Sequence, residues 1–169
     1  MLFETERLTL REATTADAPF FLTLMNEAGW LKFISNHEIR TSDQVVEYIE
    51  TKILPAYTAH GVGLWLVELK EENRPIGICG FVDRDSLDEV DIGFAFLERF
   101  GGQGYASEAA EGCLNFAKSQ LSNDNILAIV LPENLRSVKL LKKLGFKLKS
   151  DFSHPGSEEK LDLYTIENR

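Results

Sequence analysis

The sequence has few of the residues that build metal sites and disulfide frameworks. Its 169 residues include two cysteines and three histidines. Cys79 and Cys113 stand in apolar stretches without the spacing of a metal site, which indicates a reducing, cytoplasmic setting. His37, His60 and His154 are scattered along the chain. We therefore expect exposed or hydrogen-bonded histidines and no bound metal.

Long apolar runs and an excess of positive charge are missing as well. No hydrophobic stretch approaches the length of a membrane span, and residues 1–7 have neither the basic start nor the apolar core of a signal peptide. The formal net charge of −9 at pH 7 argues against a protein that tracks nucleic-acid phosphates. We expect no membrane and no nucleic-acid partner, and the length fits a single domain, residues 1–169.

What the sequence does contain is a glycine-rich junction between an apolar, strand-like stretch and a helix, within residues 91–110. Gly101, Gly102 and Gly104 fall in this junction, where glycine lets the backbone adopt a positive φ and lets another molecule approach closely. The first turn of the following helix presents N–H groups without internal partners at the positive end of the helix dipole. Such a junction predicts a pyrophosphate-binding site.

Dinucleotide-binding proteins use a junction of this kind. Gly102-x-Gly104-x-x-Ser107 approaches their fingerprint, and Glu133 follows as a candidate ribose-binding acid. A dinucleotide-binding sheet, however, needs helical crossovers between its parallel strands. Here the three strands predicted before the junction are joined by short polar turns, which permit only hairpins; these strands are residues 64–69, 75–81 and 89–97. The meander disfavours a nicotinamide-dependent oxidoreductase.

The rest of the chain predicts an α+β domain. Apolar residues at helical spacing predict four helices, after Thr14 or Thr15, after a cap at Ser42, over 106–119 and over 135–144. Besides the meander, apolar stretches predict strands at 7–11, 126–131, 146–149 and 160–166. Residues 26–40 follow neither pattern and are expected to be irregular.

Arg99-x-x-Gly102-x-Gly104 resembles the cofactor motif of the GCN5-related N-acetyltransferases (GNAT superfamily), which bind acetyl-CoA. Four further motifs are similar, in the same order, to the branch of RimJ/RimL-type ribosomal-protein alanine N-acetyltransferases. They are Thr5-Glu6-Arg7-Leu8-Thr9-Leu10-Arg11, Gly104-Tyr105-Ala106-Ser107-Glu108-Ala109, Asn134-x-x-Ser137 with Gly145-Phe146, and Asp162-Leu163-Tyr164. The resemblance implies the GNAT-like (acyl-CoA N-acyltransferase) fold, with a mixed, mostly antiparallel sheet of about seven strands flanked by about four helices.

The resemblance also implies an acetyl-CoA-dependent N-acetyltransferase that transfers the acetyl group directly to a primary amine in a ternary complex, with no metal. In similar proteins the main chain near Phe96 and Leu97 pairs with pantetheine, and the amides of residues 102–106 hold the pyrophosphate. The cofactor-binding residues expected in this way are Phe96, Leu97, Arg99, Gly102, Gln103, Gly104, Tyr105, Ala106, Asn134 and Ser137. The alternative is that the glycines only make a tight turn and Asn134 only caps its helix.

The catalytic residues are less well defined because the chain departs from the family pattern. Many GNAT enzymes have a tyrosine as general acid where Leu141 stands, and the branch usually has proline at Glu98 and often tryptophan at Gly101. The candidate proton donor to the thiolate is then Ser137. The candidate bases are Asp91, Glu158 and Glu159. Alternatively, Ser137 bonds to backbone, Asp91 pairs across the sheet and the two glutamates are solvated charges.

The pKa of an amine decides how readily it can act as the acceptor at pH 7. A lysine amine, with a pKa of about 10.4, loses its proton at pH 7 at a cost of roughly 4–5 kcal/mol, whereas an α-amine near 7.7–8.0 needs about 1 kcal/mol. A site without an obvious base thus favours a protein N-terminal amine or a small amine. A non-catalytic acyl-CoA-binding module is the alternative function, and the sequence leaves open whether the protein is a monomer or a homodimer.

Overall fold

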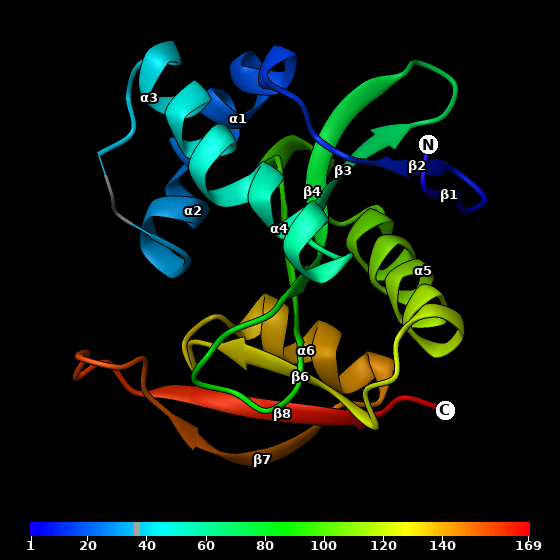
Figure 1. Cartoon of the computed structure of the whole chain (residues 1–169), viewed down its shortest axis with the longest axis vertical. Helices are drawn as coiled ribbons and strands as arrows, with labels where there is room; N and C mark the ends of the chain where they lie inside the picture. The colour runs from blue at the N-terminus through cyan, green and yellow to red at the C-terminus, as the bar shows by residue number, and fades with distance from the viewer. Residues whose placement is uncertain (36–37) are drawn as a thin grey trace.

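The computed structural model describes residues 1–35 and 38–169. Within these residues the core of the fold is one eight-stranded sheet of order β1-β2-β3-β4-β5-β6-β8-β7 (Figure 1). The strands are β1 (Phe3–Glu4), β2 (Leu8–Arg11), β3 (Leu64–Leu69), β4 (Arg74–Val82), β5 (Asp91–Phe96), β6 (Asn125–Val130), β7 (Lys147–Phe152) and β8 (Leu161–Glu167). β5 and β6 are parallel and all the other neighbours are antiparallel. The predicted mixed, mostly antiparallel sheet is confirmed, with one strand more than expected.

The described residues form six α-helices where about four were predicted. They are α1 (Ala18–Met25), α2 (Ala28–Phe33), α3 (Ser42–Tyr48), α4 (Leu54–His60), α5 (Tyr105–Gln120) and α6 (Leu135–Leu144). A 3₁₀ turn (Thr15–Asp17) precedes α1, and a π-helical turn (Ile49–Ile53) joins α3 to α4. The helix predicted after Ser42 is thus one long segment divided at the π turn.

Two details of the helical prediction are wrong. Thr41, not Ser42, caps α3: Thr41 has an extended backbone, its Oγ1 accepts from the Gln44 amide (3.2 Å), and its own amide donates to Gln44 Oε1 (3.1 Å). Residues 26–40 are not wholly irregular, because Ala28–Phe33 form α2. No side chain caps α2, so the sequence carries no start signal for it, and burial of Trp30 in the core stabilises it instead.

Alternating residues of the central strands build a hydrophobic cluster on each face of the sheet. On β3, Trp65 and Val67 belong to the cluster that includes α5, whereas Leu66 belongs to the cluster formed with α1, α2 and α3. β4 alternates in the same way, with Cys79 facing α5 and Ile78 the other side. The sheet therefore separates two helical layers, and β5, which follows in the same sheet, has access to both.

The cysteines and histidines have mainly structural positions. Cys79 and Cys113 are buried free thiols with their Sγ atoms 3.5 Å apart. His60 Nδ1 lies 3.1 Å from an Asp83 carboxylate oxygen, and His37 lies outside the described residues. Over residues 1–35 and 38–169, no cluster of histidine, cysteine and acidic side chains could hold a metal ion. In the same residues no helix is long and apolar enough to cross a membrane.

Candidate active site

β5 and β6 diverge immediately after they meet. The two parallel strands share one register pair in the described chain, Asp91 with Leu127, beside a bond from the Leu127 amide to the Val90 carbonyl (2.9 Å). On its other edge β5 remains paired with β4 to its end, where the Leu97 amide donates to the Ile76 carbonyl (2.9 Å). The backbone groups of β5 that face β6 are therefore available to pair with another extended molecule.

The end of β5 leads into the glycine turn. After a 3₁₀ turn (Glu98–Phe100), Gly102 and Gly104 adopt positive φ angles of 74° and 83°, and Gly104 is the residue before α5. No side chain caps α5, and the first amide that bonds back into it is that of Glu108, which donates to the Gly104 carbonyl (3.0 Å). The amides of residues 102–107 have no hydrogen-bond acceptor among the described residues, so they can bind an external acceptor at the positive end of a long helix.

A brace from the N-terminal strand holds this turn in place. The Glu108 carboxylate accepts hydrogen bonds from the Thr5 hydroxyl, the Arg7 amide (2.8 Å) and Arg7 Nε (2.7 Å). The same guanidinium donates to the Gln103 carbonyl (3.0 Å) and lies 4.3 Å from the centre of the Tyr105 ring. Although partial burial opposes it, these hydrogen bonds lower the pKa of Glu108. The glycine turn is thus attached to the rigid sheet.

Arg7 is a site residue that the sequence analysis did not identify. The one indication of this contact in the sequence was that the Thr5–Arg11 motif and the motif beginning at Gly104 occur together. Because about a hundred residues separate Arg7 from Glu108, the sequence alone did not predict that they meet. Arg99, which was predicted to bind the cofactor, is exposed and lies over the Phe100 ring (5.0 Å).

The rim of the turn explains two departures from the family pattern. The Glu98 amide donates to Glu27 Oε1 (2.9 Å), which a proline could not do, and Glu98 Oε1 accepts from the Gly29 amide (3.1 Å). A Cβ at Gly101 would come within 2.9 Å of Arg136 Nη1, so Arg136 occupies the space where a larger side chain would stand. The turn is therefore hydrogen-bonded to the start of α2 and lies close to Arg136 of α6.

Asn134 and Ser137 lie at the start of α6. Asn134 Oδ1 accepts from the Ser137 amide (3.4 Å), which makes Asn134 the cap of the helix. Both residues are partly buried, and the structure shows no hydrogen bond of the Ser137 hydroxyl within the ranges it describes. The capping role of Asn134 is therefore present, and the Ser137 hydroxyl can accept a further partner.

Asp91 is the buried acid at the point where β5 and β6 meet. Ile92 and Phe94 belong to the α5 cluster, so the alternation of β5 directs Asp91 to the opposite face, where Ala95 packs with the cluster of α1 to α3. Its Oδ1 lies 2.9 Å from Arg84 Nε, so it pairs with the β4–β5 connection rather than across the sheet. Burial raises the pKa of Asp91, and the Arg84 charge offsets part of that rise.

The two glutamates predicted as alternative bases lie in the polar connection between β7 and β8. Glu158 and Glu159 are both exposed, and the Glu159 amide bonds to Ser157 Oγ (3.1 Å). Within the described ranges, no hydrogen bond of either glutamate reaches Asp91 or the glycine turn. Among the candidate bases, burial distinguishes Asp91 from the two glutamates.

The arrangement consists of a parallel strand pair that separates at the start of β5, a glycine turn after the strand and an uncapped helix. A family model described as "Acetyltransferase (GNAT) domain" matches residues 7–147. The chain therefore belongs to the GNAT acetyltransferase family and is an N-acetyltransferase.

Known relatives agree with this assignment. YjdG of Bacillus subtilis, named as an uncharacterized N-acetyltransferase, is 30% identical over 171 residues, which cover 97% of this chain and 98% of its own. An acetyltransferase from Agrobacterium tumefaciens has a TM-score of 0.81 at 25% identity, with 97% of this chain and 92% of that one covered. RimL, the ribosomal L7/L12 α-N-protein acetyltransferase in complex with coenzyme A, has a TM-score of 0.83 at 16% identity, covering 98% and 97%. At that identity the likeness to RimL concerns the fold.

Proposed function

We propose that this protein transfers an acetyl group from acetyl-CoA directly to a primary amine in a ternary complex, without a metal. The observation that carries the proposal is that β5 has one register pair with β6, at its start, and that the rest of this strand edge leads to the glycine turn and the uncapped start of α5. An extended pantetheine arm requires unpaired strand edge, and a pyrophosphate requires open amides and positive potential. Both requirements are met in one continuous segment of the chain.

In this proposal each half of the cofactor has its own element. Pantetheine pairs with β5 near Phe96 and Leu97, and the pyrophosphate binds the amides from Gly102 to Ala106. The Arg7 brace fixes those amides before the cofactor arrives, which reduces the entropy lost on binding. Asn134 and Ser137, at the start of α6, are the predicted neighbours of the thioester end.

The reaction needs one base and one acid. The neutral amine attacks the thioester carbonyl, its proton passes to Asp91 directly or through water, and collapse of the tetrahedral intermediate breaks the carbon–sulfur bond. The leaving thiolate takes a proton from Ser137, and Ser137 regains a proton through water as Asp91 releases the one it accepted from the amine. Burial supports Asp91 in this role because it raises the pKa of the carboxyl and so strengthens the base. The products are the acetylated amine and CoA.

We infer that the acceptor is a protein N-terminal amine or a small amine. The α-amine needs about 1 kcal/mol to lose its proton at pH 7, against roughly 4–5 kcal/mol for a lysine side chain. Structural neighbours include both kinds of enzyme, RimL and a chimera of the spermidine N-acetyltransferase SpeG. A screen of N-terminal peptides, polyamines and a lysine-containing peptide with a blocked N-terminus tests this point, and acetylation of the lysine alone would contradict it.

A thermal shift measurement with acetyl-CoA, CoA and NADH tests the cofactor. A ligand at about a hundred times its Kd adds roughly 2.7 kcal/mol of stability, which corresponds to a Tm rise of about 5 to 10 °C for a chain of this size. We expect the rise with both CoA species and none with NADH. No rise with millimolar acetyl-CoA would refute the proposal, and binding without CoA release in any acceptor screen would favour a non-catalytic acyl-CoA-binding module.

The role of Ser137 is tested by Ser137→Ala. The variant is expected to lower kcat while leaving the Kd for acetyl-CoA nearly unchanged, because a proton donor to the thiolate acts only when the thioester breaks. Ser119→Ala is the matched control, since Ser119 is exposed near the end of α5 and bonds to the Phe116 carbonyl. An unchanged kcat for Ser137→Ala would remove the hydroxyl from the mechanism.

The remaining expectations from the sequence stay predictions. They are a cytoplasmic location, a monomeric or dimeric state, and the absence of nucleic-acid and membrane partners. Size-exclusion chromatography with light scattering is the direct measurement of the oligomeric state.

A further inference from the structure

We propose that Arg84 is a positioning residue of acetyl transfer, which fixes the orientation and the negative charge of the Asp91 carboxylate. The inference rests on the proposed role of Asp91 as the base. It assigns a task to the β4–β5 connection, which carries none of the family motifs. Arg84 is not expected to touch the cofactor or the acceptor in this role.

The contact is specific for one carboxylate oxygen. Arg84 Nε donates to Asp91 Oδ1 at 2.9 Å, while the Asp91 side chain is 4% exposed and that of Arg84 35% exposed. The connection itself is folded back on Arg84, whose carbonyl accepts from the Leu87 amide (3.1 Å). Holding Oδ1 fixes the plane of the carboxylate and leaves Oδ2 without a side-chain partner among the described residues. Oδ2 is thus the oxygen that can take the proton of the amine.

Arg84 is surrounded by ionisable groups from four elements. Asp83, on the same connection, adds negative charge near Asp91, and His60 at the end of α4 lies 3.1 Å from the Asp83 carboxylate. The Arg84 charge also acts on Tyr48 of α3 and on His154 of the β7–β8 connection. Burial raises the pKa of Tyr48, and burial followed by the Arg84 charge lowers that of His154. Arg84 is the cation that acts on Asp91, Tyr48 and His154.

Without Arg84, burial would favour the neutral, protonated form of Asp91. Burial disfavours the charged form, and an arginine within hydrogen-bond distance favours it. A protonated Asp91 could not accept the proton of the acceptor amine. Arg84 therefore extends the range in which the base is ready toward lower pH.

The direct test follows the ¹³C chemical shift of the Asp91 side-chain carboxyl by NMR during a pH titration, which a 19.1 kDa protein allows. In Arg84→Gln the midpoint is expected to rise by about one to three pH units, and in Arg84→Lys by less. Arg169→Gln is the control, because it removes one positive charge from a side chain that is 83% exposed. An unchanged Asp91 midpoint in a folded Arg84→Gln protein would overturn the proposal.

Kinetics separate this inference from the proposed function. If Asp91 is the base, the acidic limb of kcat/KM moves upward in Arg84→Gln by the same interval as the NMR midpoint, and the KM for acetyl-CoA stays nearly constant. Full activity of Asp91→Asn would refute the base while the NMR titration still decides the Arg84–Asp91 coupling. A shifted midpoint without a shifted kinetic limb would show that Arg84 acts on Asp91 but not on the reaction, and so overturn the positioning role.

Discussion

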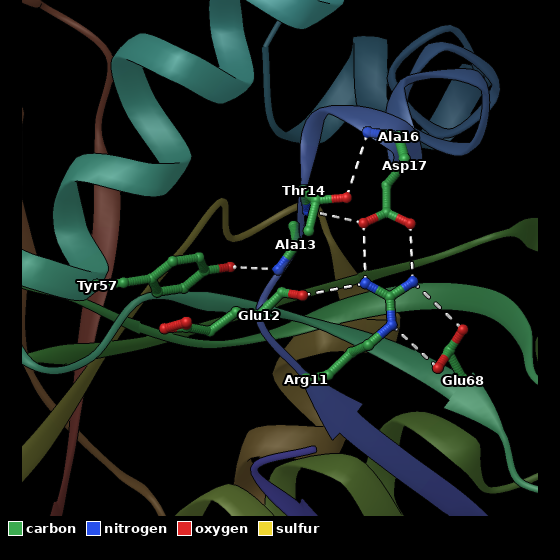
Figure 2. A network of polar contacts seen from close by, with 8 residues as sticks. All are labelled: Arg11, Glu12, Ala13, Thr14, Ala16, Asp17, Tyr57 and Glu68. Carbon is green, nitrogen blue, oxygen red and sulfur yellow. Dashed lines mark hydrogen bonds and ion pairs between the residues drawn. The ribbon is translucent and has the colours of Figure 1, made fainter.

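Asp17 and Asp91 are the buried acids of the described chain, and their surroundings act on them in opposite directions. Asp17 receives two hydrogen bonds from the Arg11 guanidinium (2.8 and 2.9 Å) and one from the Thr14 amide (2.8 Å), as Figure 2 shows. Burial opposes ionisation there, but these bonds lower the pKa of Asp17. Asp91 has one cationic partner, and its pKa is raised. The folded state thus favours the ionised form of Asp17 and disfavours the ionised form of Asp91, and a disfavoured buried charge indicates a functional residue.

Asp91→Asn tests that contrast. The raised pKa means that the stability contributed by Asp91 is present below the unfolded value, 3.8, and is lost as the pH rises through the folded value. At pH 7 the neutral amide is therefore expected to leave the Tm unchanged or higher, while kcat falls about a hundredfold or more. Thermal unfolding and steady-state kinetics measure the two effects. A Tm several degrees lower would mark Asp91 as a structural residue.

Asp17→Asn is expected to behave in the opposite way. Because its folded pKa is lowered, the contribution of Asp17 is present above the unfolded value, 3.8, and is lost as the pH falls through the folded value. We expect the variant to lose about 2 kcal/mol or more at pH 7 by urea unfolding, and less at pH 3. Asp43→Asn, an exposed acid in the first turn of α3, is the control. An equal loss at both pH values would exclude the ionic contribution.

At the scale of the element, the proposed function of the segment from β5 to α5 depends on its backbone rather than on its side chains. The strand has one free edge, the turn needs positive φ at Gly102 and Gly104, and the helix starts without a cap. Each requirement leaves polar backbone groups exposed, which is costly in an ordinary loop but useful where a ligand supplies the partners.

Gly102→Ala separates the backbone cost from the ligand contact. A Cβ at Gly102 meets no atom within 4 Å, so the cost of the substitution is the strain of φ 74°, about 1–2 kcal/mol. Gly61→Ala is the matched control, because Gly61 has φ 70°, equally open space and a position after α4. Both variants are expected to lose similar stability, but only Gly102→Ala should raise the Kd for acetyl-CoA by calorimetry. Equal cofactor affinity in both would exclude the turn as the binding site.

The elements that were predicted correctly are those with a local signal. The meander strands, α5 and α6 have continuous periodic patterns, and Gly145 ends α6 with a positive φ of 104°. α2 and the two-residue β1 lack such a pattern. They form because Trp30 enters the core and because Phe3 pairs with Leu10 of β2 and packs on Trp65. Their stability comes from tertiary contacts, which local sequence does not encode.

At the scale of the whole molecule, the two hydrophobic clusters depend on the same sheet. Trp65 lies in the α5 cluster and Trp30 in the cluster with α1 and α3. Because the two clusters are built on opposite faces of β3 and β4, loss of the sheet removes both, and we expect them to unfold together. The chain is therefore expected to behave as the single domain that its length indicates.

The two tryptophans report on the two clusters separately. We expect Trp30→Phe and Trp65→Phe, each with one tryptophan left, to give urea transitions in which fluorescence and far-UV circular dichroism coincide within each variant. The midpoints of the variants can differ, since each substitution changes its own cluster. A fluorescence transition that precedes the circular dichroism transition in either variant would show that one cluster opens first and would contradict a single cooperative unit.

The sequence by itself determined the fold class, the glycine turn and the family, because these depend on local periodicity, on backbone conformations that favour glycine and on motifs within short segments. The tertiary structure decided what joins the segments. It placed Arg7 against Glu108, Glu98 against the start of α2, and Arg84 against Asp91. Such contacts depend on which strands and connections become neighbours, and on how deeply each charge is buried. Burial in turn sets the pKa of Asp91, which depends on the whole packed sheet and on no single segment.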